Sequence, residues 1–302
     1  MTQIGRLLTA MVTPFDAKGE VDYAQARKLA LALIKSGSDG VVVVGTTGES
    51  PTLIREEELR LFKEIKAAVG DKGNVVAGTG SNSTAEAVET TREAEKIGVD
   101  ACLLVAPYYN NPTQDGLYQH FKTIANSTKL PCIVYNVPSR TVRNVDKETI
   151  VKLSQIENII GVKEAIGTSG VGMVEQVSYV ISNSRKGFLV WSGNDADTLP
   201  ILALGGYGII SVASHLVGKQ IKQMINAYLE GQTDKAAALH RNMMPLFKDL
   251  FVVANPMPVK YAVNQVGFRV GKPRLPLLEP DEKTAAFIMN TVKKYKIDLP
   301  VK

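Results

Sequence analysis

Cysteine and histidine are scarce in this chain. Its 302 residues include two cysteines and three histidines. Cys102 and Cys132 both lie in apolar runs, which is typical of buried free thiols, so we expect no disulfide framework and a cytoplasmic location. His120, His215 and His240 lack the spacing of metal ligands, so we expect them on or beside helices and we expect no metal site.

Long apolar runs and a one-sided charge are absent too. No run approaches the about 20 apolar residues that cross a bilayer, and no basic segment followed by an apolar one opens the chain. The 35 Lys and Arg are mixed with 30 Asp and Glu, which gives a net charge of +5 without a basic block. A dispersed excess of this kind indicates a solvated surface, so we expect neither membrane nor nucleic acid as a partner.

Short apolar runs alternate with segments of helical periodicity over the first 220 or so residues. Residues 41–44 are apolar without alternation, as in a parallel strand covered on both faces. The eight runs begin near Leu7, Val41, Val75, Ala101, Cys132, Ile159, Phe188 and Gly208. Eight such β/α units predict a TIM barrel over residues 1–225. The alternative is a doubly wound open sheet, which we disfavour because no glycine-rich dinucleotide loop follows the first strand. No cofactor is therefore expected.

The strand signals stop after about residue 220. Helical periodicity continues over residues 220–230, 234–253, 258–266 and 282–295, and no long linker precedes them. We predict that residues 226–302 form a C-terminal helical extension packed on the barrel. Local signals also predict helix starts: Ser83 with Glu86 has the form of a capping box, and Asp22, Thr113 and Asp146 are expected N-caps.

Polar segments follow the predicted strands, where the active face of such a barrel is built. They comprise residues 45–50, 107–112, 135–141, 191–195 and 208–211, together with Lys163 at the end of an apolar run. Each has an ordinary explanation by itself, as a turn, an exposed loop or a lysine that reaches solvent. Because a closed barrel would point all six toward one cavity, together they indicate an active site.

The residue types specify a chemistry. Burial favours the neutral amine of a lysine, so Lys163 can attack a carbonyl compound and form an imine. The hydroxyls and backbone N–H groups of Thr46-Thr47 suit a small carboxylate, and Arg140 offers a planar fork for a second one. A tyrosine hydroxyl near the lysine can pass protons. These features predict an enzyme that holds a 2-oxo acid as an imine and joins it to, or cleaves it from, a second carbonyl compound.

The same segments resemble the dihydrodipicolinate synthase/N-acetylneuraminate lyase family of class I aldolases over nearly the whole chain. The resemblance is carried by Gly45-Thr46-Thr47-Gly48-Glu49-Ser50, by Tyr135-Asn136-Val137-Pro138 and by Gly161-Val162-Lys163-Glu164. Ser139-Arg140-Thr141 is similar to the branch that condenses pyruvate with L-aspartate 4-semialdehyde on the route to diaminopimelate and lysine. The neuraminate lyases typically carry Ser-Thr in the first loop and lack this arginine.

The resemblance implies a catalytic role for four residues. Lys163 would form the imine with pyruvate, and Tyr135 would transfer protons. Thr47 would link Tyr135 to Tyr109, which would come from a neighbouring subunit. A dimer is then the smallest competent unit, and the resemblance implies a homotetramer arranged as a dimer of dimers.

The resemblance also implies the binding residues. Thr46 and Thr47 would hold the pyruvate carboxylate, Arg140 would receive the carboxylate of the semialdehyde, and Gly193 and Ile210 would border the pocket. One departure lies beside Arg140: the position of Val142 is often glycine in the family, which puts the shape of this loop in question.

A regulatory site is a further implication. Lysine-inhibited members bind lysine at a dimer interface, at positions matching Ser50, Pro51, Arg55, Glu58, Asn82, Glu86 and Tyr108. Arg55 and Glu58 stand where sensitive bacterial members tend to have histidines, so we predict weak or absent lysine feedback.

Two alternative functions stay open from the sequence. The first is a lyase or aldolase of the same family that acts on N-acetylneuraminate or on a 2-keto-3-deoxy sugar acid, which Arg140 disfavours because a polyol site would favour hydroxyl and amide partners. The second is a non-catalytic sensor of pyruvate or amino acids. A binding protein has no need of Lys163, Tyr135 and Thr47 together, which disfavours the sensor.

Overall fold

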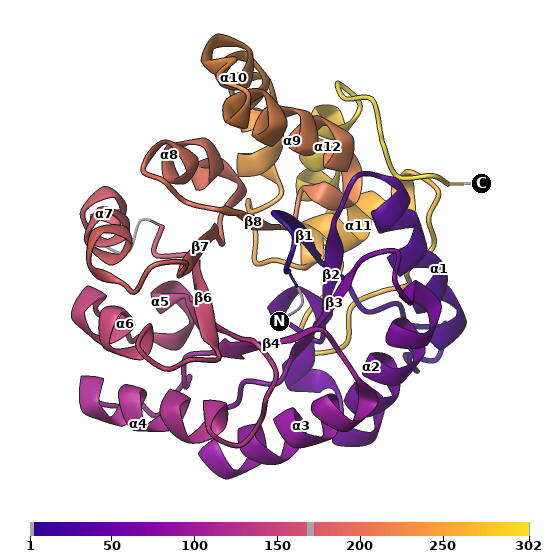
Figure 1. Cartoon of the computed structure of the whole chain (residues 1–302). Helices are drawn as coiled ribbons and strands as arrows, with labels where there is room; N and C mark the ends of the chain where they lie inside the picture. Colours follow the sequence, from indigo (N-terminus) through magenta and orange to yellow (C-terminus); the bar gives the residue numbers. More distant parts are fainter. Residues whose placement is uncertain (1–2, 168–171, 302) are drawn as a thin grey trace. The chain divides into compact units, whose positions relative to one another are not determined.

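The computed structural model describes residues 3–167 and 172–301. Its strands follow one another in chain order around a closed parallel barrel (Figure 1). They are β1 (Leu7–Ala10), β2 (Gly40–Val43), β3 (Asn74–Gly78), β4 (Ala101–Val105), β5 (Cys132–Asn136), β6 (Ile159–Glu164), β7 (Leu189–Ser192) and β8 (Gly208–Ser211). The predicted TIM barrel is confirmed, and the open sheet is wrong because the strand order closes on itself. Each predicted strand start lies within one residue of the observed one.

By its internal contacts the chain divides into two compact units. The first, which we call the central unit, comprises Met1–Arg6 and Val76–Ile210. The second, the terminal unit, comprises Leu7–Val75 and Ser211–Lys302. The terminal unit thus joins residues 7–75 to the last third of the chain.

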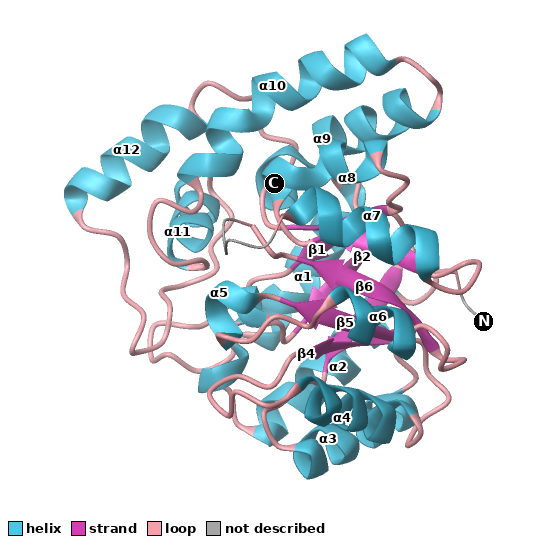
Figure 2. Cartoon of the chain, turned by 90° about the vertical axis from the view of Figure 1, so that its left-hand side faces the viewer, coloured by secondary structure: helices cyan, strands magenta, loops and turns pink. Residues whose placement is uncertain are grey.

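In the central unit, strands β4 to β7 form a continuous parallel ladder. Both faces of β5 are buried, as expected for a strand between a barrel interior and a layer of helices. Gly161 lets β6 and β7 approach closely, since a Cβ there would lie 2.3 Å from the Leu189 carbonyl oxygen. The helices beside this ladder are α3 (Thr84–Ile97), α4 (Gln114–Ala125), α5 (Pro138–Thr141), α6 (Lys147–Leu153), α7 (Met173–Asn183) and α8 (Thr198–Ala203) (Figure 2).

The terminal unit holds β1, β2 and the remaining helices. These are α1 (Tyr23–Lys35), α2 (Arg55–Val69), α9 (Ser214–Leu229), α10 (Thr233–Asp249), α11 (Met257–Gln265) and α12 (Glu282–Val292). Helix α10 packs on α9 and α12, and α11 packs on α9 and α12. The apolar stripes of the last four helices therefore face one another.

All four residues predicted to begin helices stand at N-cap positions, and three of them make the capping hydrogen bond. The side chains of Asp22, Ser83 and Thr113 each accept a hydrogen bond from a backbone N–H in the first turn. Asp146 stands at the N-cap of α6 without a capping bond, because its carboxylate accepts from the Asn144 side chain instead. The second half of the capping box predicted at Ser83 is wrong, because the Ser83 N–H donates to the Ser81 hydroxyl and the carboxylate of Glu86 accepts from that hydroxyl.

Two helices of the C-terminal extension end earlier than predicted. Helix α10 ends at Asp249, four residues before the predicted end, and the chain turns before Pro256. Helix α12 ends at Val292 instead of continuing to residue 295. In the described part of the chain no helix has the length and apolarity of a membrane span.

Candidate active site

Lys163 lies near the C-terminal end of β6, in register with Tyr135 on β5 and Trp191 on β7. Only 6% of Lys163 is exposed, and Tyr135 is buried equally deeply. The Lys163 Nζ lies 4.1 Å from the centroid of the Tyr135 ring. Two neighbouring strand ends thus bring the amine and the phenol side by side in a site screened from water.

Burial changes the protonation of this lysine. Loss of hydration lowers the pKa of Lys163 to about 7; the negative charge of Asp195 opposes this shift and the positive charge of Arg140 adds to it. A large fraction of Lys163 is therefore the neutral amine near neutral pH. Only that form has a lone pair with which to attack a carbonyl carbon.

Asp195 begins the short 3-10 turn Asp195–Asp197 after β7 and is 2% exposed. Sequence reasoning grouped it with a polar segment and assigned it no role. Gly193, two residues earlier, donates from its N–H to the carbonyl oxygen of Glu164 at 2.6 Å. A Cβ at Gly193 would lie 2.6 Å from the Ala165 Cβ, so glycine is required where β7 leaves β6. Ile210 is fully buried in β8.

Arg140 lies on α5, the single turn that follows β5, and its side chain is exposed. Val142 ends this turn with a left-handed backbone, φ +62°, and is 78% exposed. A β-branched residue rarely adopts this conformation. The loop has the backbone that glycine would favour although glycine is absent, so the departure noted at Val142 changes local strain and leaves the turn formed.

A buried polar network stands behind the lysine and was missed by sequence reasoning. Glu164 is 2% exposed and accepts hydrogen bonds from the side chains of Asn136 at 2.9 Å and Gln176 at 2.8 Å. Asn136 also donates to the Asn144 side chain and accepts from the N–H of Val145. The residues that follow Tyr135 and Lys163 are therefore tied to each other and to the end of the Arg140 loop. The one feature of the sequence that indicates this network is Glu164, a carboxylate inside an apolar strand.

Burial raises the pKa of Glu164 to about 7, against the lowering effect of these donated hydrogen bonds. Because strand residues alternate between faces, Glu164 and Lys163 point to opposite sides of β6. We therefore read Glu164 as support for the strand and not as a group that touches substrate.

Tyr108 and Tyr109 lie in the loop between β4 and α4. Tyr109 has a left-handed backbone, φ +71°, and 93% of the residue is exposed. Asn111, two residues on, is also left-handed, with φ +46°. Tyr109 is therefore an exposed tyrosine in a strained part of the loop.

Thr46 and Thr47 lie in the terminal unit, in the 3-10 turn Thr46–Gly48 that follows β2. Thr47 is 3% exposed, and its hydroxyl oxygen accepts a hydrogen bond from the side chain of Asn255 at 2.8 Å. Residues 45–49 are called the threonine turn below. Asn255 was outside the predicted site because nothing in the local sequence connects it with this turn.

The predicted regulatory residues fall into two groups. In the terminal unit, Ser50, Pro51, Arg55 and Glu58 occupy the 3-10 turn Ser50–Thr52 and the start of α2. In the central unit, Asn82, Glu86 and Tyr108 lie in the β3–α3 loop, on α3 and in the β4–α4 loop. Within this second group, the side chain of Asn110 donates to the Asn82 carbonyl oxygen at 2.7 Å.

Both cysteines are buried and free, as expected. Burial raises the pKa of the Cys102 thiol to about 12 and that of Cys132 well above its usual range, which makes both thiols unreactive. Among residues 3–167 and 172–301, no three His, Cys, Asp or Glu side chains are grouped so as to hold a metal ion.

Comparison with known proteins gives one consistent result. The model of the dihydrodipicolinate synthetase family matches residues 3–295. A 4-hydroxy-tetrahydrodipicolinate synthase of Dehalococcoides mccartyi is 64% identical over 302 residues, which are all of both chains.

Solved structures agree. A dihydrodipicolinate synthase of Bacillus anthracis superposes with a TM-score of 0.94 at 43% identity, over 98% of this chain and 100% of that one. A chloride-inhibited dihydrodipicolinate synthase of Acinetobacter baumannii, solved in complex with pyruvate, superposes with a TM-score of 0.91 at 38% identity, over 96% of this chain and 98% of that one.

Proposed function

Because the chain belongs to the dihydrodipicolinate synthetase family, we propose that it condenses pyruvate with L-aspartate 4-semialdehyde, the 4-hydroxy-tetrahydrodipicolinate synthase reaction. The family consists of Schiff-base-forming lyases of the class I aldolase type. The observation that carries the proposal is Lys163, a buried amine at a strand end whose pKa lies near 7 and which faces the ring of Tyr135. The reaction would place the enzyme on the diaminopimelate route to lysine.

The first half of the reaction builds a nucleophile from pyruvate. The neutral Lys163 amine adds to the C2 carbonyl carbon of pyruvate, and water leaves as the imine forms. The imine withdraws electrons from the methyl group, whose proton is then lost to give an enamine. Tyr135, next to Lys163, transfers protons at imine formation and in later steps.

The second half joins the two substrates. The enamine carbon attacks the aldehyde carbon of the semialdehyde, and the aldehyde oxygen takes up a proton. The amine of the semialdehyde then adds to the imine carbon, closes the ring and displaces Lys163. Arg140 receives the carboxylate of this substrate at the entrance, and its exposed position on α5 suits such a role.

The remaining residues hold the reactants. Thr46 and Thr47 bind the pyruvate carboxylate through hydroxyl and backbone N–H groups. Thr47 also links Tyr135 to Tyr109 of a neighbouring subunit in a hydroxyl relay. Gly193 and the backbone of Ile210 border the bound pyruvate. We further propose a cytoplasmic homotetramer built as a dimer of dimers. The high exposure of Tyr109 supports its use by another subunit, and the two free cysteines suit a reducing compartment.

Borohydride reduction in the presence of pyruvate tests the proposal. We expect one pyruvate-derived adduct, located on Lys163 by peptide mass mapping, and none in Lys163→Met. Turnover is then measured with aspartate semialdehyde, N-acetylneuraminate and 2-keto-3-deoxygluconate. Activity with the first alone is the expected result. Folded protein without an adduct contradicts the imine mechanism, and activity with a sugar acid reassigns the second substrate.

A further inference from the structure

The threonine turn has a strained backbone at both sides. Val44, before it, has φ +60°, and Glu49, its last residue, has φ +59°. Three backbone hydrogen bonds close the turn, from the N–H groups of Gly48, Glu49 and Ser50 to the carbonyl oxygens of Gly45 and Thr46. Non-glycine residues in this conformation persist only where their surroundings hold them. The contacts that hold this turn are therefore of interest.

Most of those contacts come from the last fifth of the chain. The Lys260 Nζ donates to Glu49 Oε1 at 2.6 Å, and the backbone N–H of Arg274 donates to Glu49 Oε2 at 2.8 Å. The Asn255 side chain donates to the Thr47 hydroxyl. Both carboxylate oxygens of Glu49 and the hydroxyl of Thr47 are thus bound by residues that follow β8 by more than forty positions.

The Glu49–Lys260 pair is fully buried, with 0% of either side chain exposed. The Lys260 Nζ lies 3.9 Å from the centroid of the Phe15 ring, and the Arg274 guanidinium lies 4.5 Å from that centroid. Removing two charges from water offsets most of the attraction between them, so such a pair adds little stability over apolar side chains of the same size. Its presence here calls for a function other than stability.

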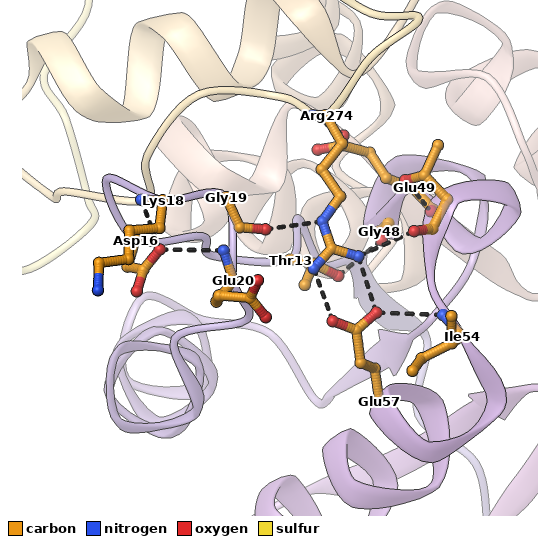
Figure 3. A network of polar contacts seen from close by, with 11 residues as sticks. Thr13, Asp16, Lys18, Gly19, Glu20, Gly48, Glu49, Ile54, Glu57 and Arg274 are labelled. Atoms are coloured by element: carbon orange, nitrogen blue, oxygen red, sulfur yellow. Dashed lines mark hydrogen bonds and ion pairs between the residues drawn. The ribbon is translucent and has the colours of Figure 1, made fainter.

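The side chain of Arg274 makes a further set of contacts that fix its position (Figure 3). Its guanidinium binds both carboxylate oxygens of Glu57, at 2.6 and 2.7 Å, and donates to the carbonyl oxygens of Gly19 and Thr52. Thr13 donates to the carbonyl oxygen of Gly48 at 2.6 Å. Since Arg274 is itself held in place, its backbone N–H is a fixed point against which Glu49 is aligned.

We propose that the buried Glu49–Lys260 pair is a positioning device that holds the threonine turn in its pyruvate-binding conformation. Neither residue touches substrate; they act through the backbone of residues 45–49. The inference rests on the proposed function, because it takes Thr46 and Thr47 to bind the pyruvate carboxylate. It assigns residues of α11 and the following loop to the pyruvate affinity of the enzyme.

The Glu49–Lys260 pair could instead serve stability alone. A double variant distinguishes this structural role from positioning of the threonine turn. Either single change, Glu49→Gln or Lys260→Met, leaves one buried charge or polar group without its partner and lowers the melting temperature. The double variant Glu49→Gln/Lys260→Met removes both charges and recovers most of that loss. If the pair positions the turn, the affinity for pyruvate does not recover with it.

The measurement is the pyruvate concentration that gives half-maximal borohydride trapping on Lys163. We expect this concentration to be raised roughly tenfold to hundredfold in the double variant, because small displacements of binding groups have effects of this size. Hydrogen exchange at residues 45–50 should be faster than in the unaltered enzyme. Lys222→Met, which breaks the Lys222–Asp39 pair of the same unit, is the matched control and should change neither quantity.

Either unaltered exchange at residues 45–50 or an unaltered half-saturating concentration in the double variant overturns the inference. Should that variant not fold, Glu49→Gln at about pH 8.5 takes its place. Burial lowers the pKa of Lys260 to about 8 even beside Glu49, and loss of that negative charge lowers it further, so a neutral amine faces the amide. Failure of the proposed function is recognised separately, by the absence of an adduct in the unaltered enzyme.

Discussion

At the scale of single residues, charges that flank Lys163 set the pH at which it reacts. Burial displaces its pKa downward, Arg140 displaces it further, and Asp195 acts in the opposite direction. The nucleophile is the deprotonated amine, so its amount falls about tenfold for each pH unit below the pKa. Sequence reasoning found Lys163 from its place at a strand end. It could not assign Asp195 an effect on the pKa of Lys163, because such an effect depends on distance and burial.

Variants of the two flanking residues should therefore move the pH profile in opposite directions. In the unaltered enzyme, the rate of imine trapping at saturating pyruvate should rise with pH and level off above about pH 7. Arg140→Ala removes a positive charge, raises the pKa of Lys163 and moves the rise to higher pH. Asp195→Asn removes a negative charge and moves it to lower pH. Stopped trapping at a series of pH values measures both shifts. Displacement of both profiles in the same direction contradicts this assignment.

At the scale of secondary-structure elements, side-chain hydrogen bonds connect β5, β6 and α7. Asn136 and Gln176 both donate to the buried Glu164, and Asn136 also binds the end of the Arg140 loop. The pKa of Glu164 in the folded protein, about 7, is above the ordinary value of 4.5 for a glutamate carboxyl. This group therefore supports folding most below about pH 4.5, and that support is lost as the pH rises through about 7.

Removal of one donor should destabilise the protein in a pH-dependent way. Gln176→Leu leaves Glu164 without a hydrogen bond that favours its charged form, and we expect a loss of about 1–3 kcal/mol in the free energy of unfolding. The loss should be larger at about pH 8.5, where Glu164 is ionised, than at about pH 6. Urea unfolding at the two pH values measures it.

The control for this change is Gln155→Leu, at an exposed glutamine after α6, for which we expect an effect within about 0.5 kcal/mol. Equal losses for the Gln176 variant at the two pH values would count against an ionised, hydrogen-bonded Glu164.

Periodicity predicted most elements, because strands and helices repeat their apolar positions at fixed intervals. The eight strand starts were predicted with an error of at most one residue. The Glu164 network could not be predicted in this way, since Glu164 lies 28 residues from Asn136 and 12 from Gln176. Asp146 stands at the predicted N-cap of α6 but lacks the capping bond for a related reason: a neighbouring amide, from Asn144, competes for its carboxylate.

At the scale of the whole molecule, the position of Tyr109 predicts that active sites are shared between subunits. The residue is almost fully exposed and its backbone is strained, which is unusual for a tyrosine without a partner surface. In the proposed relay it completes the site of another copy. Two inactive variants should then restore each other.

Co-expression of Tyr109→Ala with Lys163→Met tests this sharing. Each variant alone should be nearly inactive, whereas a mixed dimer combines an intact Lys163 from one chain with an intact Tyr109 from the other. A random equal mixture should regain about a quarter of the unaltered activity, because half of the dimers are mixed and each has one complete site. Co-expression of Tyr109→Ala with the double variant Tyr109→Ala/Lys163→Met is the control and should regain none. If the co-expressed mixture is no more active than the two single variants, Tyr109 does not act across subunits.

The barrel and the site segments were accessible from the sequence because they recur at predictable places, the C-terminal ends of strands. The partners of the threonine turn were not. Asn255, Lys260 and Arg274 lie 208, 211 and 225 residues from the groups that they bind. Only the folded chain shows that residues of the tail contact the first polar loop.

The same separation has a consequence for biosynthesis. Glu49 is translated 211 residues before Lys260, so at about 5–20 residues per second it leaves the ribosome roughly 10–40 s before its partner. During that interval a nascent chain has the residues of the threonine turn without the contacts that hold it. With the positioning role proposed for the Glu49–Lys260 pair, we expect competence to bind pyruvate to be gained late in synthesis. A chain released before residue 260 would carry Lys163 and yet bind pyruvate poorly.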